Sequence, residues 1–326
     1  MTWSIETDQT FPLSSVKPFD GLLPYRARCL SETRAACGAG TRRRAASPVT
    51  GAPLLPAGEV EGCAYLRCPD TGSLFLAELP PAAAWASLLS RLSRSRHSSE
   101  TFHAGIAEQR QEHVHGPKLD WIRSSLRMQG MARPDALHAA TVPSEATARL
   151  EESGAFHRVT LVDEMALASG AHQPAGPGGF GAAVLFESAD RVDDPAALLA
   201  AVHRCLAPGG LIFLTALVAS GFDVAVLGLK NRYLYPPDRT NCFSLGGLEQ
   251  LLQRAGFALL EVSTPGVLDV EIVQTHLRAD PALPLSAFER QVLRADRQTQ
   301  QAFQTFLQQH RMSSFARIIG RKREVA

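Results

Sequence analysis

Two acidic side chains that could contact a ligand stand at the ends of short apolar runs. Asp163 ends the run 158–163, RVTLVD, and Glu187 ends the run 182–187, AAVLFE. A carboxylate in such a place can accept hydrogen bonds from the hydroxyl or ammonium groups of a bound molecule. It can equally cap the helix that follows, and Glu164 is a neighbouring alternative to Asp163.

Arg239 and Asn241 lie in a second polar stretch, residues 236–244, PPDRTNCFS. Arginine stays protonated near neutral pH, so it can bind an anion but cannot act as a general base. The sequence has no G-x-S-x-G, H-E-x-x-H or G-K-[ST] motif, so no nucleophile, zinc-protease or phosphate-loop constellation stands out. One interpretation is therefore a different reaction, in which His138, Arg191 or Arg239 binds an anionic ligand.

The elements that must position these residues follow from the apolar pattern. Residues 182–187 are apolar on both faces, as a strand of a covered parallel sheet must be. An amphipathic helix follows, and Pro208-Gly209-Gly210 ends it and leads into a second apolar strand, residues 211–217. The inward face of that helix is formed by Leu198, Leu199, Val202 and Leu206.

Other segments extend the same α/β pattern. Residues 158–163 and 257–262 read as further buried strands, and residues 168–179 read as a loop, so one strand of the usual sheet is shortened or missing. Residues 80–129 read as helical, and 288–310 as one long helix before a last strand at 315–320.

The order from strand 182–187 through the helix and the Pro-Gly-Gly stop resembles the fourth strand–helix unit of class I methyltransferases dependent on S-adenosylmethionine (SAM). Residues 264–270, TPGVLDV, resemble a turn found in many bacterial members. The resemblance covers about residues 108–322. It implies a Rossmann-like sheet with helices on both faces and an antiparallel last strand. It also implies that SAM contacts Asp163, which would bind the ribose hydroxyls, with Glu187, His138 and Ala140.

The loop that should hold SAM departs from the family pattern D/E-x-G-x-G-x-G, whose glycines let backbone N–H groups approach the ligand. The corresponding run is 135–144, DALHAATVPS, with no glycine. The acid becomes His138, and the three glycines become Ala140, Val142 and Ser144. Val142 disfavours positive φ, and Pro143 removes an N–H.

We therefore predict a catalytically inactive protein, a binding or structural subunit that binds SAM weakly or not at all. The alternative is an active SAM-dependent methyltransferase that acts on a small molecule or sugar with a divergent cofactor loop. The family's substrate loop keeps Asn241 but has Arg239 where members carry a histidine, whose pKa suits proton transfer near neutral pH. Arg239 and Asn241 are the catalytic candidates that remain.

Residues 42–81 contain two similar turns, 47–51 and 68–72, which resemble the paired C-P-x-C-G knuckles of the family's N-terminal zinc ribbon. Three of the four thiolate positions are Ser47, Thr50 and Thr71, which leaves only Cys68. Tetrahedral zinc needs four good nitrogen or sulfur ligands. We therefore expect no metal and a ribbon-shaped module held by packing, with a zinc site completed by another cysteine or a histidine as the alternative.

The predicted division is a leader and ribbon-like module (1–80), a helical connector or cap (81–130) and a Rossmann-like domain (131–326). His113 and His115 could suggest a metal pair, but we expect them to belong to the helical cap. With 326 residues, 45% hydrophobic, there is enough chain for a sizeable core.

Composition also bounds the partners and the compartment. A net charge of +1 gives no field that would attract nucleic acid or an acidic membrane. No apolar run reaches the roughly 18 to 20 residues that cross a bilayer, and the cysteines form no C-x-x-C pair. We expect a cytoplasmic protein with reduced thiols and no membrane span.

An inactive protein must act through its surface, so we expect an unknown protein partner, and a homo-oligomer is possible. The candidate interfaces are the ribbon-like module and the apolar part of the insert that follows residue 217. The residues of that part of the insert are Leu227, Leu229, Tyr233, Leu234 and Tyr235. The alternative is that these residues form a buried lid.

Overall fold

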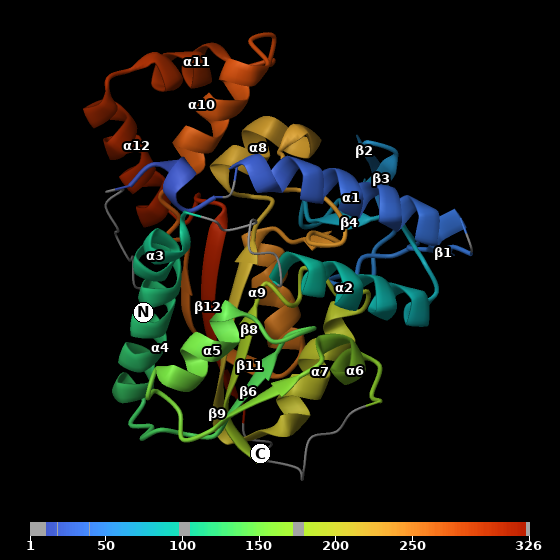
Figure 1. Cartoon of the computed structure of the whole chain (residues 1–326), viewed down its shortest axis with the longest axis vertical. Helices are drawn as coiled ribbons and strands as arrows, with labels where there is room; N and C mark the ends of the chain where they lie inside the picture. Colours follow the sequence, from blue (N-terminus) through green and yellow to red (C-terminus); the bar gives the residue numbers. More distant parts are fainter. Residues whose placement is uncertain (1–10, 18, 39, 98–104, 172–178, 324–326) are drawn as a thin grey trace.

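The computed structural model describes residues 11–17, 19–38, 40–97, 105–171 and 179–323. At its centre is a six-stranded sheet in the order β11-β12-β9-β8-β6-β7 (Figure 1). The strands are β6 (Ala136–Ala139), β7 (Val159–Val162), β8 (Phe180–Phe186), β9 (Leu206–Leu217), β11 (Phe257–Ser263) and β12 (Phe315–Lys322). β7, β6, β8 and β9 are parallel, and β12 runs antiparallel to both of its neighbours. This confirms the predicted Rossmann-like sheet and its antiparallel last strand.

β7 is an edge strand of this sheet within the described residues. It leads into α6 (Glu164–Ala168), and the predicted loop 168–179 begins where that helix ends. Residues 172–178 of that loop lie outside the described residues. Between α6 and β8 the described residues contain no strand, and the prediction of a shortened or missing strand stays a prediction.

Helices cover both faces of the sheet. Ala182 and Val184 of β8 pack on one side, in a core with Trp121 and Ile122 of α4 (Gly116–Met128) and Leu150 of α5 (Glu145–Glu152). Their neighbours Ala183 and Leu185 face the other side, in a core that contains apolar residues of α7 (Pro195–Cys205) and α9 (Leu245–Arg254). This alternation is the reason why β8 is apolar at every position but Gly181.

The N-terminal part contains a long helix, α1 (Phe19–Gly38), that the sequence reading missed, because its apolar residues do not form a clear stripe. It is followed by β1 (Arg42–Arg43), which pairs with β5 (Glu78–Leu79), and by α2 (Ala82–His97). Figure 1 shows α1 crossing over one end of the central sheet, with α2 beneath it.

A second, four-stranded sheet has the order β10-β4-β3-β2. β2 (Leu55–Val60), β3 (Cys63–Arg67) and β4 (Leu74–Leu76) belong to the N-terminal part, whereas β10 (Asn241–Cys242) comes from the polar stretch beyond β9. Asn241 pairs with Phe75, and Cys242 with Leu74. The predicted division at residue 80 stays a prediction, and this sheet joins residues from both sides of it.

Two expectations about the later part of the chain were wrong. The predicted single helix 288–310 is two helices, α11 (Ala287–Arg294) and α12 (Arg297–Gln309). Asp296 between them accepts a hydrogen bond from the N–H of Thr299 and so caps the second helix. The helix before Pro208 ends earlier than predicted, at Cys205, and Pro208-Gly209-Gly210 lies within β9.

The predicted exposed interface in the insert was also wrong, because the insert is covered by the rest of the chain. Leu227, Tyr233, Leu234 and Tyr235 are buried and Leu229 is partly buried. α8 (Phe222–Leu227) and the short turn Gly228–Lys230 pack against α10 (Asp269–Ala279) and β2. The buried-lid alternative is therefore confirmed. None of the helices in the described part of the chain is long and apolar enough to cross a membrane.

Candidate functional site

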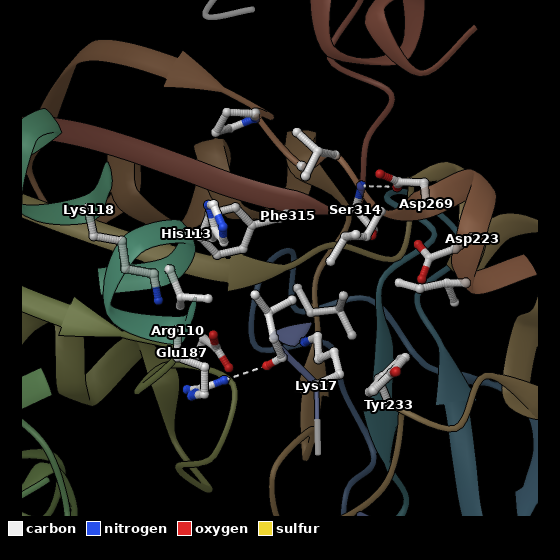
Figure 2. A pocket seen from close by; sticks show the side chains of 18 of the residues that line it. Lys17, Arg110, His113, Lys118, Glu187, Asp223, Tyr233, Asp269, Ser314 and Phe315 are labelled. Carbon is white, nitrogen blue, oxygen red and sulfur yellow. Dashed lines mark hydrogen bonds between the residues drawn. The ribbon is translucent and has the colours of Figure 1, made fainter. Parts of the chain in front are cut away.

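A cavity of about 340 Å³ opens at the end of the sheet where β8 and β9 finish and β12 begins. Its walls come from segments far apart in the sequence: residues 16–22, the helical region 110–118, the insert with Tyr233, and the turn before α10. Figure 2 shows charged side chains from these segments pointing into it. The cationic lining residues are Lys17, Arg96, Arg110, Lys118, Arg239 and Arg317.

Glu187 lies at the centre of the cationic wall. It follows β8 directly and has a φ of 61°, a left-handed conformation that costs a non-glycine residue about 1–3 kcal/mol. Its N–H donates to the carbonyl of Thr215, and its Oε2 lies 2.6 Å from Nη2 of Arg239. Although burial opposes it, Arg239, Lys118 and Lys17 together hold the pKa of Glu187 well below its usual range. Glu187 is therefore ionised and paired with an arginine.

Lys118 and Lys17 bring two amines into the cavity without an ion pair among the described residues. The Lys118 Nζ lies 4.8 Å from the ring centre of Phe186 and 5.3 Å from that of Phe315, and the Lys17 Nζ lies 4.7 Å from the ring centre of Tyr233. Burial lowers the pKa of each amine to about 8, against the opposing attraction of Glu187. Both lysines are still mostly charged at neutral pH.

The opposite end of the cavity carries two carboxylates. Asp269 is fully engaged: it accepts hydrogen bonds from Ser313 Oγ (2.6 Å), the Ser314 N–H (2.7 Å) and Gln304 Nε2 (2.8 Å). Asp223 accepts one from Asn231 Nδ2 (3.0 Å), and burial followed by repulsion from Asp269 raises its pKa to about 7. Oδ1 of Asp223 and the hydroxyl of Tyr233 are buried without a hydrogen-bond partner in the described part of the chain.

The resemblance implies that SAM binds at the ends of β6, β7 and β8. In the structure an ion pair lies there. Glu164 is fully buried, and its Oε1 accepts hydrogen bonds from Thr141 Oγ1 (2.6 Å) and Arg191 Nε (3.1 Å). Arg191 Nη2 donates to Oε2 at 3.2 Å. The three residues follow β6, β7 and β8 respectively, so one buried ion pair ties together the ends of three neighbouring strands.

Asp163 is the N-cap of α6, because its Oδ1 accepts hydrogen bonds from the N–H groups of Met165 and Ala166. It does not line the cavity that holds Glu187, and neither do His138 and Ala140. The structure thus brings Glu187 and Arg239 together and leaves the other predicted cofactor residues apart from them. In this structure the side chain of Asp163 caps a helix, which is the alternative role considered for it.

The rewritten loop after β6 folds as an ordinary strand-to-helix connection. The Ala140 N–H donates to the carbonyl of Val162, and Ser144 caps α5 in a reciprocal arrangement with Thr147. His138 is buried in β6 with its ring edge-on to Phe186, and its Nδ1 has no partner among the described residues. With no glycine in the loop and Glu164 already paired, these residues do not fit SAM in the way in which the family holds it.

Asn241 does not face the cavity. Its Nδ2 donates to the carbonyls of Ala189 and Val192, each at 2.8 Å, and its own N–H donates to the carbonyl of Asp190. It therefore fastens β10 to the segment that follows Glu187. Of the two catalytic candidates, only Arg239 lines the cavity, and it lies there as the buried partner of Glu187.

The two knuckle-like turns of the N-terminal part meet around Cys68. Burial raises the pKa of this thiol, but hydrogen bonds from Ser47, Thr71 and Thr50 outweigh burial and lower it to about 7. The Thr50 Oγ1 lies 3.6 Å from Sγ of Cys68. Across the described ranges, no group of three or more His, Cys, Asp and Glu side chains could hold a metal ion. The hydroxyls of Ser47, Thr71 and Thr50 thus surround the thiol of Cys68.

His138 leads to a prediction about acid stability. Burial, with repulsion from Arg191, lowers its pKa to about 3. The unfolded chain binds a proton below about pH 6.5 and the folded one does not, so stability is lost as the pH falls. Between pH 7 and pH 5 this histidine is expected to remove about 2 kcal/mol from the free energy of unfolding. Urea unfolding of wild type and His138→Leu at both pH values measures it. The fall in the free energy of unfolding from pH 7 to pH 5 should be smaller in the variant by that amount. Equal falls in the two proteins would refute the prediction.

The parallel sheet with its antiparallel last strand, and the cavity at the strand ends, define a class I methyltransferase fold. A family model described as "Methyltransferase domain" matches residues 85–262, more than half of the chain. The chain belongs to this family. No curated protein is a significant match to the sequence.

Solved structures of similar shape include methyltransferases from several organisms. The 1,6-didemethyltoxoflavin-N1-methyltransferase of Burkholderia thailandensis is 15% identical, with 83% of this chain and 100% of that chain covered and a TM-score of 0.44. A possible histamine N-methyltransferase of Thermotoga maritima is also 15% identical, with 68% and 98% covered and a TM-score of 0.38.

Sequence reading missed most of the cationic residues of the cavity. Lys17, Arg110 and Lys118 lie before the sheet begins, in segments without a motif. Only their packing over the strand ends brings them to Glu187. By contrast, the contact between Glu164 and Arg191 had a signal, since they follow β7 and β8, the two parallel strands on either side of β6. The carboxyl ends of parallel strands lie at the same edge of a sheet.

Proposed function

We propose that this protein is a methyltransferase-fold pseudoenzyme, a binding or structural subunit that does not transfer methyl groups. The observation that carries the proposal is the ion pair of Glu164 and Arg191, joined by Thr141. It engages the acid next to the ribose-binding position and lies across the strand ends that SAM would need. The absence of glycine in the loop 140–144 supports the same conclusion, because backbone N–H groups there cannot approach a ligand closely.

Breaking this ion pair to admit SAM would be costly. Removing Glu164 from Arg191 leaves two buried charges without partners, which costs several kcal/mol. A ligand would have to supply that free energy in addition to its own binding. The proposal includes a cytoplasmic location, which is consistent with six free cysteines.

Titration with SAM and with S-adenosylhomocysteine tests the proposal. We expect no binding heat and no thermal shift with either compound up to about 1 mM. A dissociation constant in the low micromolar range for either compound would refute the proposal.

The active-methyltransferase alternative predicts the opposite result and a dependence on Asp163. Asp163→Ala should then abolish the SAM-induced thermal shift. Under the proposal the same substitution lowers stability by about 1 kcal/mol through the lost helix cap, with or without SAM. Thermal unfolding of both proteins with and without ligand separates the two outcomes.

A further inference from the structure

The cavity around Glu187 holds more positive charge than its own acids neutralise. Glu187 is paired with Arg239, and Asp238 with Arg96. Lys17, Arg110, Lys118 and Arg317 lie within 4.0 Å of no carboxylate in the described part of the chain. Figure 2 shows Lys17, Arg110 and Lys118 gathered around Glu187. The side chains that line this cavity therefore place a surplus of cations in a confined space.

Such a surplus is costly unless something compensates for it. Aromatic rings face Lys17, Lys118 and Arg317, and a cation over a ring gains about 0.5–2 kcal/mol. That is less than the cost of burying an unpaired charge. Lys118 is only 9% exposed. An anion placed among these side chains would supply the missing opposite charge through charge-assisted hydrogen bonds.

The end of the cavity near Asp223 and Tyr233 is suited to neutral polar groups of a ligand. Asp223 and Tyr233 line the cavity. Oδ1 of Asp223 and the hydroxyl of Tyr233 are buried beside it and lack hydrogen-bond partners among the described residues. Since burial brings the pKa of Asp223 to about 7, this acid can either donate or accept near neutral pH. A hydroxyl group on a ligand both donates and accepts, so it satisfies these two atoms.

The two ends are close enough for one molecule. The Lys17 amine lies 4.7 Å from the ring centre of Tyr233, so the cationic wall adjoins the Tyr233–Asp223 end. A volume of about 340 Å³ is at the lower end of the range for small-molecule sites, roughly 300 to 1,000 Å³. From these contacts we propose that the cavity binds a small organic anion that carries hydroxyl groups, such as a phosphorylated polyol. Its anionic group lies among Lys118, Arg110 and Lys17, and its hydroxyls lie toward Asp223 and Tyr233.

This inference goes beyond the proposed function and does not depend on it. A protein without methyl transfer can keep a ligand in the part of the old pocket that faces the insert. An active enzyme would use the same anion as the molecule that it modifies. The experiment therefore measures anion binding and SAM binding separately on the same samples.

Isothermal titration with glucose 6-phosphate, inorganic phosphate and glucose tests the proposal. We expect glucose 6-phosphate to bind at least about tenfold more tightly than phosphate, and glucose not to bind. Raising the salt concentration should weaken binding, because charge carries much of the affinity. No heat with glucose 6-phosphate at millimolar concentration, or equal affinity for glucose, would overturn the proposal.

Variants locate the site. Lys118→Met keeps the apolar stem and should weaken glucose 6-phosphate binding at least about tenfold. The melting temperature of the free protein should change little, because the substitution removes the attraction of Lys118 to Glu187 but also its repulsion from Arg317 and Arg110 and the cost of burying its charge. Asp223→Asn should reduce the preference for glucose 6-phosphate over phosphate. Lys230→Met is the matched control, since Lys230 is exposed, pairs with Asp280 and lies outside the cavity.

Unchanged affinity in Lys118→Met, or an equal loss in Lys230→Met, would refute the site. SAM binding with a low micromolar constant would refute the pseudoenzyme but leave the anion result standing. Failure of the anions alone would leave the SAM result standing.

Discussion

Gly221→Ala is expected to lower the free energy of unfolding by more than about 3 kcal/mol, beyond the usual cost of overpacking. A Cβ at this position would lie against the Cα, Cβ and N of Ser314, well inside contact distance. Backbone cannot move aside as a flexible side chain can. The φ of Gly221 is −76°, which any residue adopts, so the effect is steric and does not come from backbone strain.

The contact between the segments that contain Gly221 and Ser314 also holds the acidic end of the cavity in place. The N–H of Val218 donates to the carbonyl of Ser314, and the N–H of Phe222 to that of Met312. Pushing these segments apart would also separate Ser314 from Asp269, which accepts its N–H.

Gly246→Ala is the matched control for this substitution. Gly246 lies inside α9, and a Cβ there meets nothing within 4 Å. Alanine should stabilise that helix by up to about 1 kcal/mol. Urea unfolding of both variants measures the difference. A midpoint for Gly221→Ala equal to that of wild type would show that the two segments separate easily.

Arg239→Met is expected to cost about 3 kcal/mol, toward the low end for breaking a buried ion pair. The substitution removes the guanidinium that lies 2.6 Å from the Glu187 carboxylate. Glu187 cannot easily turn away, because its backbone is held in a conformation with positive φ. Lys17 and Lys118 still attract Glu187, which limits the loss.

A double-mutant cycle with Glu187→Gln measures the pair itself. The double variant should recover part of the stability lost by Arg239→Met, because Glu187 then carries no unpaired charge. Recovery is incomplete because buried Asp190, 3.5 Å from Arg239, also loses this partner. Unfolding by urea at pH 7 gives the four free energies. If the double variant is less stable than Arg239→Met by the full cost of Glu187→Gln, the two residues do not interact and the prediction is wrong.

The central sheet was predictable because its strands carry a strong local signal. β8 and β9 are buried on both faces, so nearly every residue is apolar, and Gly256 marks the start of β11. The break at Asp296 was not recognised, because the apolar spacing continues across it and only the cap distinguishes two helices from one. α1 gave no signal, since it is held by tertiary contacts and contains Pro24.

The site was less predictable than the sheet for a physical reason. A strand end can be located from the sequence, so Glu187 and Arg239 were found. Whether an acid there faces a ligand or another part of the chain depends on side chains that arrive from elsewhere. Asp163 accepts hydrogen bonds from the first turn of α6, and Glu164 pairs with Arg191, 27 residues later in the chain. Loss of the loop glycines was visible, but what replaced their ligand contacts was not.

β10 has a consequence for the order in which the protein is made. The N-terminal strands β2, β3 and β4 are complete by residue 76, but the strand that pairs with β4 ends at Cys242 of a 326-residue chain. Chains emerge from the ribosome at roughly 5–20 residues per second, and N-terminal units usually fold first. Here the edge of β4 has to wait for some 166 further residues, the difference between 242 and 76. The sheet that contains β2, β3 and β4 is thus completed only after most of the central sheet has been made, and a nascent chain halted before residue 241 exposes an unpaired strand edge.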